Sequence, residues 1–279
     1  MNDLDDFPLE DRDVLPSGDP AVAIGWWIAG TAVIIGIAVV AYLTFARRPP
    51  SVQVATSRTP AVAETAPLGG KTEPVALPPL DDSDPLVRSL VRALSDHEAV
   101  VAWLATKGLI RNFTAAVVNV ADGLTPAKQL SALHPAGPFR IIGRAGSVYV
   151  DPKGYARYGA VADAVGSIDP AAAAKLYSTL KPRIEDAAGE LGVPESQFDP
   201  ILQRAIVTLL ETPTPDVPLQ VVPKVEGIGY AFSSTRYEGL SDAQKPLLRM
   251  GPHNARIIKT KLREIALALG VPAARLPPE

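Results

Sequence analysis

The chain has 279 residues, a formal net charge of −3 and no cysteine. The absence of thiols excludes disulfides, cysteine catalysis and cysteine-ligated zinc or iron–sulfur sites. Residues 81–279 hold 22 basic and 21 acidic side chains, and this balance gives no electrostatic reason to expect nucleic acid as a partner.

An uncharged segment at residues 21–46 follows an acidic tail at residues 1–20. About 20 apolar residues are enough to cross the hydrocarbon core of a bilayer. Trp26 and Trp27 lie near one end of the segment and Tyr42 near the other, as expected for aromatic side chains at two membrane interfaces. A cleaved signal peptide would need a basic start and a shorter apolar core. The segment therefore predicts one transmembrane helix that binds the lipid bilayer.

Residues 47–80 contain seven prolines among small and polar residues and show no apolar periodicity. This composition is typical of an extended, semi-rigid linker. Basic residues after residue 46 outnumber the single Arg12 before the apolar segment, so the positive-inside rule favours a cytoplasmic C-terminal domain. A long spacer favours the opposite side, because it lets a domain work away from the bilayer in the bacterial envelope.

Residues 81–272 are predicted to form a compact, mostly helical domain, followed by a short tail at 273–279. Apolar residues at helical spacing predict helices at 85–94, 97–106, 110–120, 155–165, 170–191, 200–211, 241–249 and 252–269. Pro182 is expected to bend the longest of these helices. Short β-rich runs at 139–143, 147–150, 219–222 and 229–232 predict one or two β-hairpins.

Four Asp-Pro pairs recur in the domain, at Asp84, Asp151, Asp169 and Asp199. Asp is a good N-cap, and proline fits the first helical position because its missing N–H costs nothing there. We interpret these four aspartates as helix caps rather than as catalytic carboxylates.

Sequence motifs of known catalytic or cofactor sites are missing. The three histidines, His97, His134 and His253, are far apart and have no partner at the spacing of metal ligands. There is no Gly-x-Ser-x-Gly elbow, and Gly227-Ile228-Gly229 lacks the third glycine of a dinucleotide fingerprint. We therefore predict no metal, no cofactor and no catalytic residue.

Two clusters of aromatic, basic and turn-forming residues are the candidate interaction sites. They comprise Tyr155, Arg157, Tyr158, Arg249, Met250, Gly251, Pro252 and Asn254. A tight corner between two helices explains the second cluster as well as a binding site does, because glycine can end one helix while proline starts the next.

Five stretches follow one another along the chain: LDDSD at 80–84, YARY at 155–158, ELGVP at 190–194, QKPLLRMGPHN at 244–254 and KLREI at 261–265. In that order they resemble the bacterial family called domain of unknown function 3014. Members of this family typically have a membrane helix, a Pro-rich linker and this one domain. The resemblance implies a bacterial envelope protein and no established activity. The acidic tail at 1–20 departs from the family, whose members often have basic residues there.

We expect a single-pass protein of the bacterial inner membrane whose helical domain faces the periplasm, with a cytoplasmic domain as the alternative. The domain is expected to be non-enzymatic and to bind another envelope protein. The competing hypothesis is an anchored hydrolase that acts on an envelope polymer, in which case acid–base catalysis would come from dispersed carboxylates such as Asp163, Glu190 or Glu238.

Overall fold

The computed structural model describes residues 67–70, 76–93, 95, 97–135, 137–224 and 229–278. The predicted acidic tail and transmembrane segment at 21–46 lie outside these residues, as does most of the predicted linker. Among the described residues, no helix is both long and apolar enough to cross a membrane.

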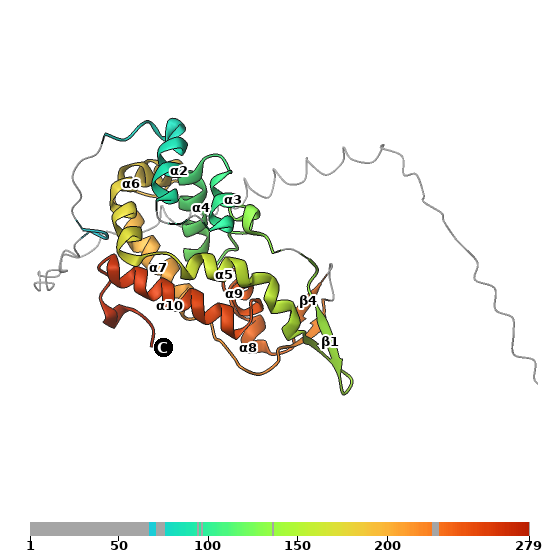
Figure 1. Ribbon diagram of the computed structural model, residues 1–279. Coiled ribbons are helices and arrows are strands. Elements are labelled where there is room, and N and C mark those ends of the chain that lie inside the picture. The colour runs from blue at the N-terminus through green and yellow to red at the C-terminus, as the bar shows by residue number, and fades with distance from the viewer. Residues whose placement is uncertain are drawn as a thin grey trace, which may run out of the picture. The chain divides into compact units, whose positions relative to one another are not determined.

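The prediction of a mostly helical domain is confirmed (Figure 1). The helices are α2 (Asp84–Arg92), α3 (Glu98–Leu104), α4 (Leu109–Ala121), α5 (Gly159–Gly166), α6 (Pro170–Glu190), α7 (Phe198–Leu210), α8 (Thr235–Glu238), α9 (Gln244–Arg249) and α10 (Pro252–Ala268). The strands are β1 (Ile141–Arg144), β2 (Ser147–Val150), β3 (Gln220–Pro223) and β4 (Tyr230–Phe232). Two features differ from the prediction: α8 was not expected, and Pro152–Tyr158 forms a 3₁₀ segment ahead of α5.

Two of the four Asp-Pro pairs cap helices as predicted. The side chain of Asp151 accepts a hydrogen bond from the N–H of Lys153, and that of Asp169 accepts one from the N–H of Ala172. These bonds satisfy backbone donors that the first turn of a helix leaves free. They fix where the 3₁₀ segment and α6 begin.

The other two aspartates are not caps of their own helices, and that interpretation was wrong. Asp84 accepts hydrogen bonds from the N–H groups of Gly108 and Leu109, so it caps the distant helix α4. Asp199 lies inside the first turn of α7 and binds groups from other parts of the chain. The local pattern shows that a carboxylate stands at a helix start, but it does not show which donors reach that carboxylate.

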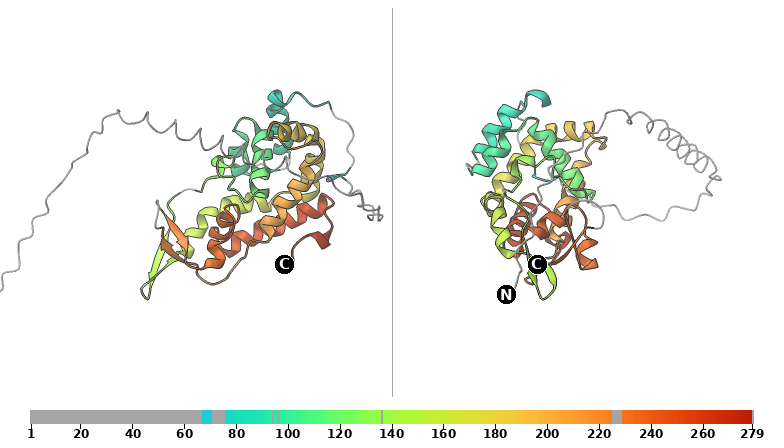
Figure 2. Two further views of the ribbon diagram at one scale, coloured as in Figure 1. Left: turned by 180° about the vertical axis from the view of Figure 1, so that it is seen from behind. Right: turned by 90° about the vertical axis from the view of Figure 1, so that its right-hand side faces the viewer.

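The strands form a single antiparallel sheet in the order β1-β2-β3-β4. The two predicted hairpins are thus joined side by side, through the pairs Val148–Val221 and Tyr149–Gln220. Figure 1 shows the sheet at one end of the domain and α2 and α6 at the other, and the rotated views in Figure 2 show the β1–β2 hairpin projecting outward.

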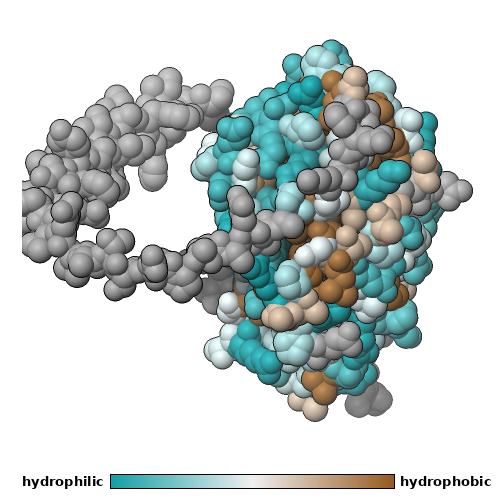
Figure 3. Space-filling view, turned by 90° about the vertical axis from the view of Figure 1, so that its left-hand side faces the viewer, coloured by the Kyte–Doolittle hydropathy of each residue, from teal (hydrophilic) through white to brown (hydrophobic). Residues whose placement is uncertain are grey.

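The main hydrophobic core lies between α2, α4, α6, α7 and α10. Phe198 is completely buried at its centre, with the rings of Phe113 and Tyr177 at 6.3 and 6.5 Å. A second cluster packs one face of the sheet against Leu248 of α9. On the face in Figure 3, apolar residues reach the surface in separate places among hydrophilic ones.

The core extends beyond the predicted start of the domain. Leu77 and Leu80 pack against the main cluster, and Leu68 is buried within it, with 5% of its surface exposed. These residues come from the stretch at 47–80 that the composition assigns to an extended linker. The proline content predicts an extended backbone, but it does not predict whether a leucine within the stretch is buried in the core.

Candidate functional site

The corner between α9 and α10 is built on Gly251. Its φ of 83° and ψ of 162° lie in a region that only glycine adopts readily. A Cβ at this position would stand 2.5 Å from two ring carbons of Tyr155. Glycine is therefore needed both for the backbone path and for the close approach of this aromatic ring.

Asn254 fastens the same corner to the 3₁₀ segment. Its Nδ2 donates hydrogen bonds of 2.9 Å to the carbonyls of Tyr155 and Met250, and the side chain is only 6% exposed. Met250 directly follows α9, where carbonyls lack helical donors, and Tyr155 lies within the 3₁₀ segment. One buried amide thus joins two segments that lie about 100 residues apart in the sequence.

The 3₁₀ segment is positioned by Asp151. Besides accepting from the N–H of Lys153, the Asp151 carboxylate accepts from Nε of Arg140 at 3.1 Å. The backbone hydrogen bond from Lys153 and then the Arg140 charge outweigh desolvation and hold the pKa of Asp151 below its usual value. Asp151 is therefore ionised at neutral pH and keeps the start of the segment in place.

A proline-rich loop between α7 and β3 lies over this corner. Nζ of Lys259 donates a 2.7 Å hydrogen bond to the carbonyl of Thr212, and Arg256 forms a 2.5 Å ion pair with Asp216. Both basic side chains come from α10. They hold the loop against the N-terminal half of that helix.

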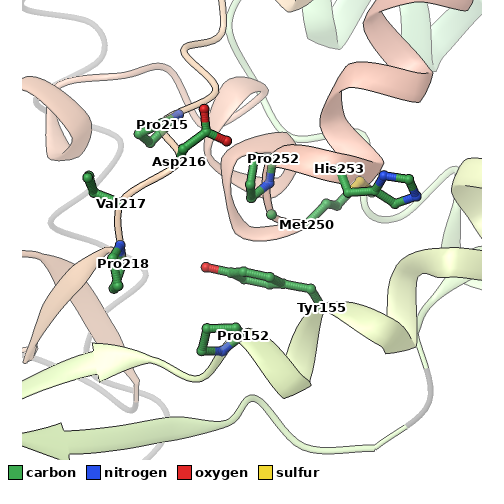
Figure 4. Close-up of a pocket in the computed structure, with 10 residues that line it drawn as sticks. Pro152, Tyr155, Pro215, Asp216, Val217, Pro218, Met250, Pro252 and His253 are labelled. Carbon is green, nitrogen blue, oxygen red and sulfur yellow. The ribbon is translucent and has the colours of Figure 1, made fainter.

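These three segments line a half-open apolar pocket of about 220 Å³, shown in Figure 4. In the figure the Tyr155 ring lies between Pro152 on one side and Met250 and Pro252 on the other, and its hydroxyl points toward Pro218. The lining residues are Pro152, Tyr155, Pro215, Asp216, Val217, Pro218, Met250, Gly251, Pro252 and His253.

The polar groups of this pocket offer little for catalysis. Burial, and secondarily the charge of Asp151, raises the pKa of Tyr155 above its usual value, so the phenol is neutral at physiological pH. Asp216 is engaged by Arg256, and the imidazole of His253 points away from the phenol (Figure 4). The arrangement suits the binding of an apolar group better than proton transfer.

Five of the eight sequence-predicted interaction residues meet at this pocket. Tyr155, Met250, Gly251 and Pro252 line it, and Asn254 lies directly behind them. The other lining residues, Pro152, His253 and the loop at 215–218, are not among those predicted from the sequence. The run TPTPDVP at 212–218 was the available signal, because three prolines in seven residues indicate a stiff loop.

The remaining three predicted residues lie elsewhere. Arg157 stacks over the ring of Tyr158, with 4.6 Å from its guanidinium carbon to the ring centre, and donates to the carbonyl of Gly137. Tyr158 is buried, and Arg249 lies 5.2 Å from the ring centre of Phe232. These side chains hold α5 and α9 against their neighbours.

The carboxylates named for a hydrolase do not converge. Glu190 forms a bidentate pair with Arg111 at 2.6 and 2.7 Å, and this pair lowers the pKa of Glu190. Burial alone would raise the pKa of Glu238, but hydrogen bonds, first from the N–H of Phe232, bring it below the usual value. Asp163 is exposed on α5. General acids need a raised pKa, which neither paired glutamate has.

The basic side chains of α10 have partners within the protein. Besides the contacts of Arg256 and Lys259 with the loop, Lys261 pairs with Glu264 at 2.5 Å and Arg263 donates to the carbonyl of Pro277. Within the described ranges, no group of three or more His, Cys, Asp or Glu side chains is arranged to hold a metal ion. The Nδ1 atom of His97 instead accepts from a backbone N–H and caps α3.

A family model described as "Protein of unknown function (DUF3014)" matches residues 109–266, which is more than half of the chain. The chain belongs to this family. The resemblance seen in the sequence is therefore confirmed. The matched range runs from the first residue of α4 almost to the end of α10, so it contains the whole sheet and every residue of the pocket. Comparisons with curated proteins and with solved structures gave no match.

Proposed function

We propose that the domain is a protein-binding module and that its pocket takes an apolar side chain of a partner. The observation that carries the proposal is the pocket itself: about 220 Å³, lined by Tyr155, Met250 and four prolines. Small-molecule sites usually enclose roughly 300–1,000 Å³. This smaller pocket suits a single side chain from a protein surface, and aromatic anchors such as Tyr155 are common at the centre of protein interfaces.

The pocket is also held rigidly. Gly251 lets Tyr155 approach the backbone, and Asn254 fixes the two segments that carry the lining residues. A preformed pocket costs less conformational entropy on binding than one that must be assembled. The Asp216–Arg256 ion pair lies at the edge, where a polar rim typically surrounds an apolar contact.

The proposal places this module in the bacterial inner membrane, anchored by the predicted transmembrane helix at 21–46 and facing the periplasm. The partner is then another envelope protein. The uncharged segment, the Pro-rich spacer and the membership of the DUF3014 family support this placement. A C-terminal fusion to alkaline phosphatase tests the side: enzyme activity supports the periplasm, and fluorescence of a reporter that matures only in the cytosol contradicts it.

Photo-crosslinking in intact cells tests the binding role. A photoreactive residue is placed at Val217 or at His253, which are both exposed at the pocket, and at the exposed Leu191 outside it as the control. We expect one adduct of the same mass from both pocket positions and none from Leu191. Equal crosslinking at all three positions, or no adduct at the pocket, would refute the proposal.

A further inference from the structure

Leu68 is buried against residues that are far from it in the sequence. With 5% of its surface exposed, it belongs to the main core cluster together with Tyr177, Phe198 and Leu269. It lies more than 40 residues before the range matched by the family model. Its burial contributes about as much to the stability of the fold as the burial of any other core leucine, so the contact is part of the core.

The backbone around Leu68 is held as firmly as its side chain. The N–H of Leu68 donates a 2.9 Å hydrogen bond to Oδ2 of Asp199, and the N–H of Gly69 donates one of 2.9 Å to the carbonyl of Leu269. Leu269 follows directly after α10, where carbonyls have no donor within the helix. Two successive backbone N–H groups of the segment thus donate to the Asp199 side chain and to a carbonyl at the end of α10.

The domain orients the Asp199 carboxylate independently of Leu68. Its Oδ1 accepts from the hydroxyl of Tyr177 and its Oδ2 from Nζ of Lys181, both at 2.5 Å. These two donors lie one turn apart on α6, and the carboxylate is only 17% exposed. Charge-assisted hydrogen bonds of this kind hold an acceptor in a fixed direction. The carboxylate is therefore held in position to accept a hydrogen bond from a backbone N–H.

Gly69 fits this site because it has no side chain. A Cβ there would stand 2.9 Å from Cβ of Ser178 and 3.1 Å from the carbonyl oxygen of Ala174, both on α6. The neighbouring Gly70 has a similar φ of 73°, against 79° for Gly69, but no atom of the described residues lies within 4 Å of its Cβ position. The two glycines thus share a positive φ, but only the Cβ position of Gly69 lies close to another described residue.

We propose that the corner formed by α6, α7 and α10 is a binding site for a Leu-Gly segment, which this chain fills with its own residues 67–70. The site recognises a leucine side chain, two consecutive amides and a residue without Cβ. Its occupant acts as a clip that fixes the tether to the domain. The chain is then fixed to the domain at residues 67–70 as well as from residue 81 onward.

The clip changes how far the domain can reach from the membrane. An extended polyproline-II tether over 47–80 would span roughly 105 Å, whereas one over 47–66 spans roughly 60 Å at about 3.1 Å per residue. The clip goes beyond the proposed function, and only its effect on reach rests on the proposed membrane helix at 21–46. It stands whether or not the Tyr155 pocket binds a partner.

Hydrogen exchange of the full-length protein in detergent tests the clip. We compare the wild type with Gly69→Ala and with the matched control Gly70→Ala. In the wild type, the amides of Leu68 and Gly69 should exchange slowly. Gly69→Ala should speed their exchange by about tenfold or more, because its new Cβ collides with α6, whereas Gly70→Ala should have a clearly smaller effect.

Exchange of α4 and α7 in the same samples shows that each variant is folded, and it should not change. Rapid exchange of Leu68 and Gly69 in the wild type would overturn the proposal. So would equal effects of the two alanine substitutions. Protection that rises with protein concentration would also overturn it, because the segment would then bind a second copy of the chain.

Discussion

Replacing Gly251 by alanine should destabilise the domain more than replacing any glycine that shares only its positive φ. The backbone conformation alone costs an alanine about 1–3 kcal/mol. The Cβ at 2.5 Å from the Tyr155 ring adds overpacking of about 1–3 kcal/mol. The expected loss is therefore about 4 kcal/mol, or roughly 8–16 °C in Tm for a domain of this size.

Gly192→Ala is the control for a positive φ without a close side-chain contact. Gly192 has a φ of 80°, close to that of Gly251, but within the part of the chain that the structure describes no atom lies within 4 Å of its Cβ position. Its substitution should cost only about 1–2 kcal/mol, because the left-handed conformation is the sole penalty. Thermal unfolding of the full-length protein in detergent, followed by far-UV circular dichroism, measures both Tm values.

A double-mutant cycle with Tyr155→Ala then separates the contact from the backbone strain. In the Tyr155→Ala background the ring is gone, so Gly251→Ala should lower Tm by only about half as much as it does in the wild type. Strictly additive effects would show that the ring is not the obstacle. Equal Tm losses for Gly251→Ala and Gly192→Ala would refute the reasoning as a whole.

Three further predictions concern single side chains. Asn254→Ala should lower stability by about 2–3 kcal/mol, read as a drop in Tm, because two carbonyls lose their buried donor. Thr114→Val should raise stability by about 1 kcal/mol, because no group among the described residues is a hydrogen-bond partner of the fully buried Thr114 hydroxyl; a fall in Tm would contradict this. Asp151→Asn should flatten the acid side of a plot of Tm against pH. The folded-state pKa of Asp151 is depressed below its ordinary value, so its stabilising contribution is present above the pKa of the unfolded chain and is lost as pH falls through the folded pKa. An unchanged acid limb would contradict the assignment of Asp151 as an ionised anchor.

Helix α10 connects the two proposed sites. Its first residues line the Tyr155 pocket, and the carbonyl of Leu269 just after its end receives the N–H of Gly69. At 1.5 Å per residue, its 17 residues span roughly 25 Å. A partner bound at the pocket would therefore be held about this far from the point where the clip fixes the tether.

The sequence by itself determined the elements of the domain and its family. Apolar residues at helical spacing located α4, α6, α7 and α10, because a helix face is set by residues three or four positions apart. The block at 244–254 carried the family resemblance and also marked the corner at Gly251. The same local reasoning identified Asp151 and Asp169 correctly as caps, since a cap binds donors two or three residues away.

Only the tertiary structure decided which of these local features meet. Tyr155 and Asn254 are 99 positions apart, and Leu68 and Asp199 are 131 apart. No periodicity or capping rule encodes such contacts, because they depend on the path of the whole chain and on which buried groups remain without partners. For that reason the sequence pattern predicts that Asp199 caps its own helix, whereas in the fold Asp199 accepts a hydrogen bond from the N–H of Leu68. For the same reason the pocket needed the loop at 215–218, which the sequence did not connect with Tyr155.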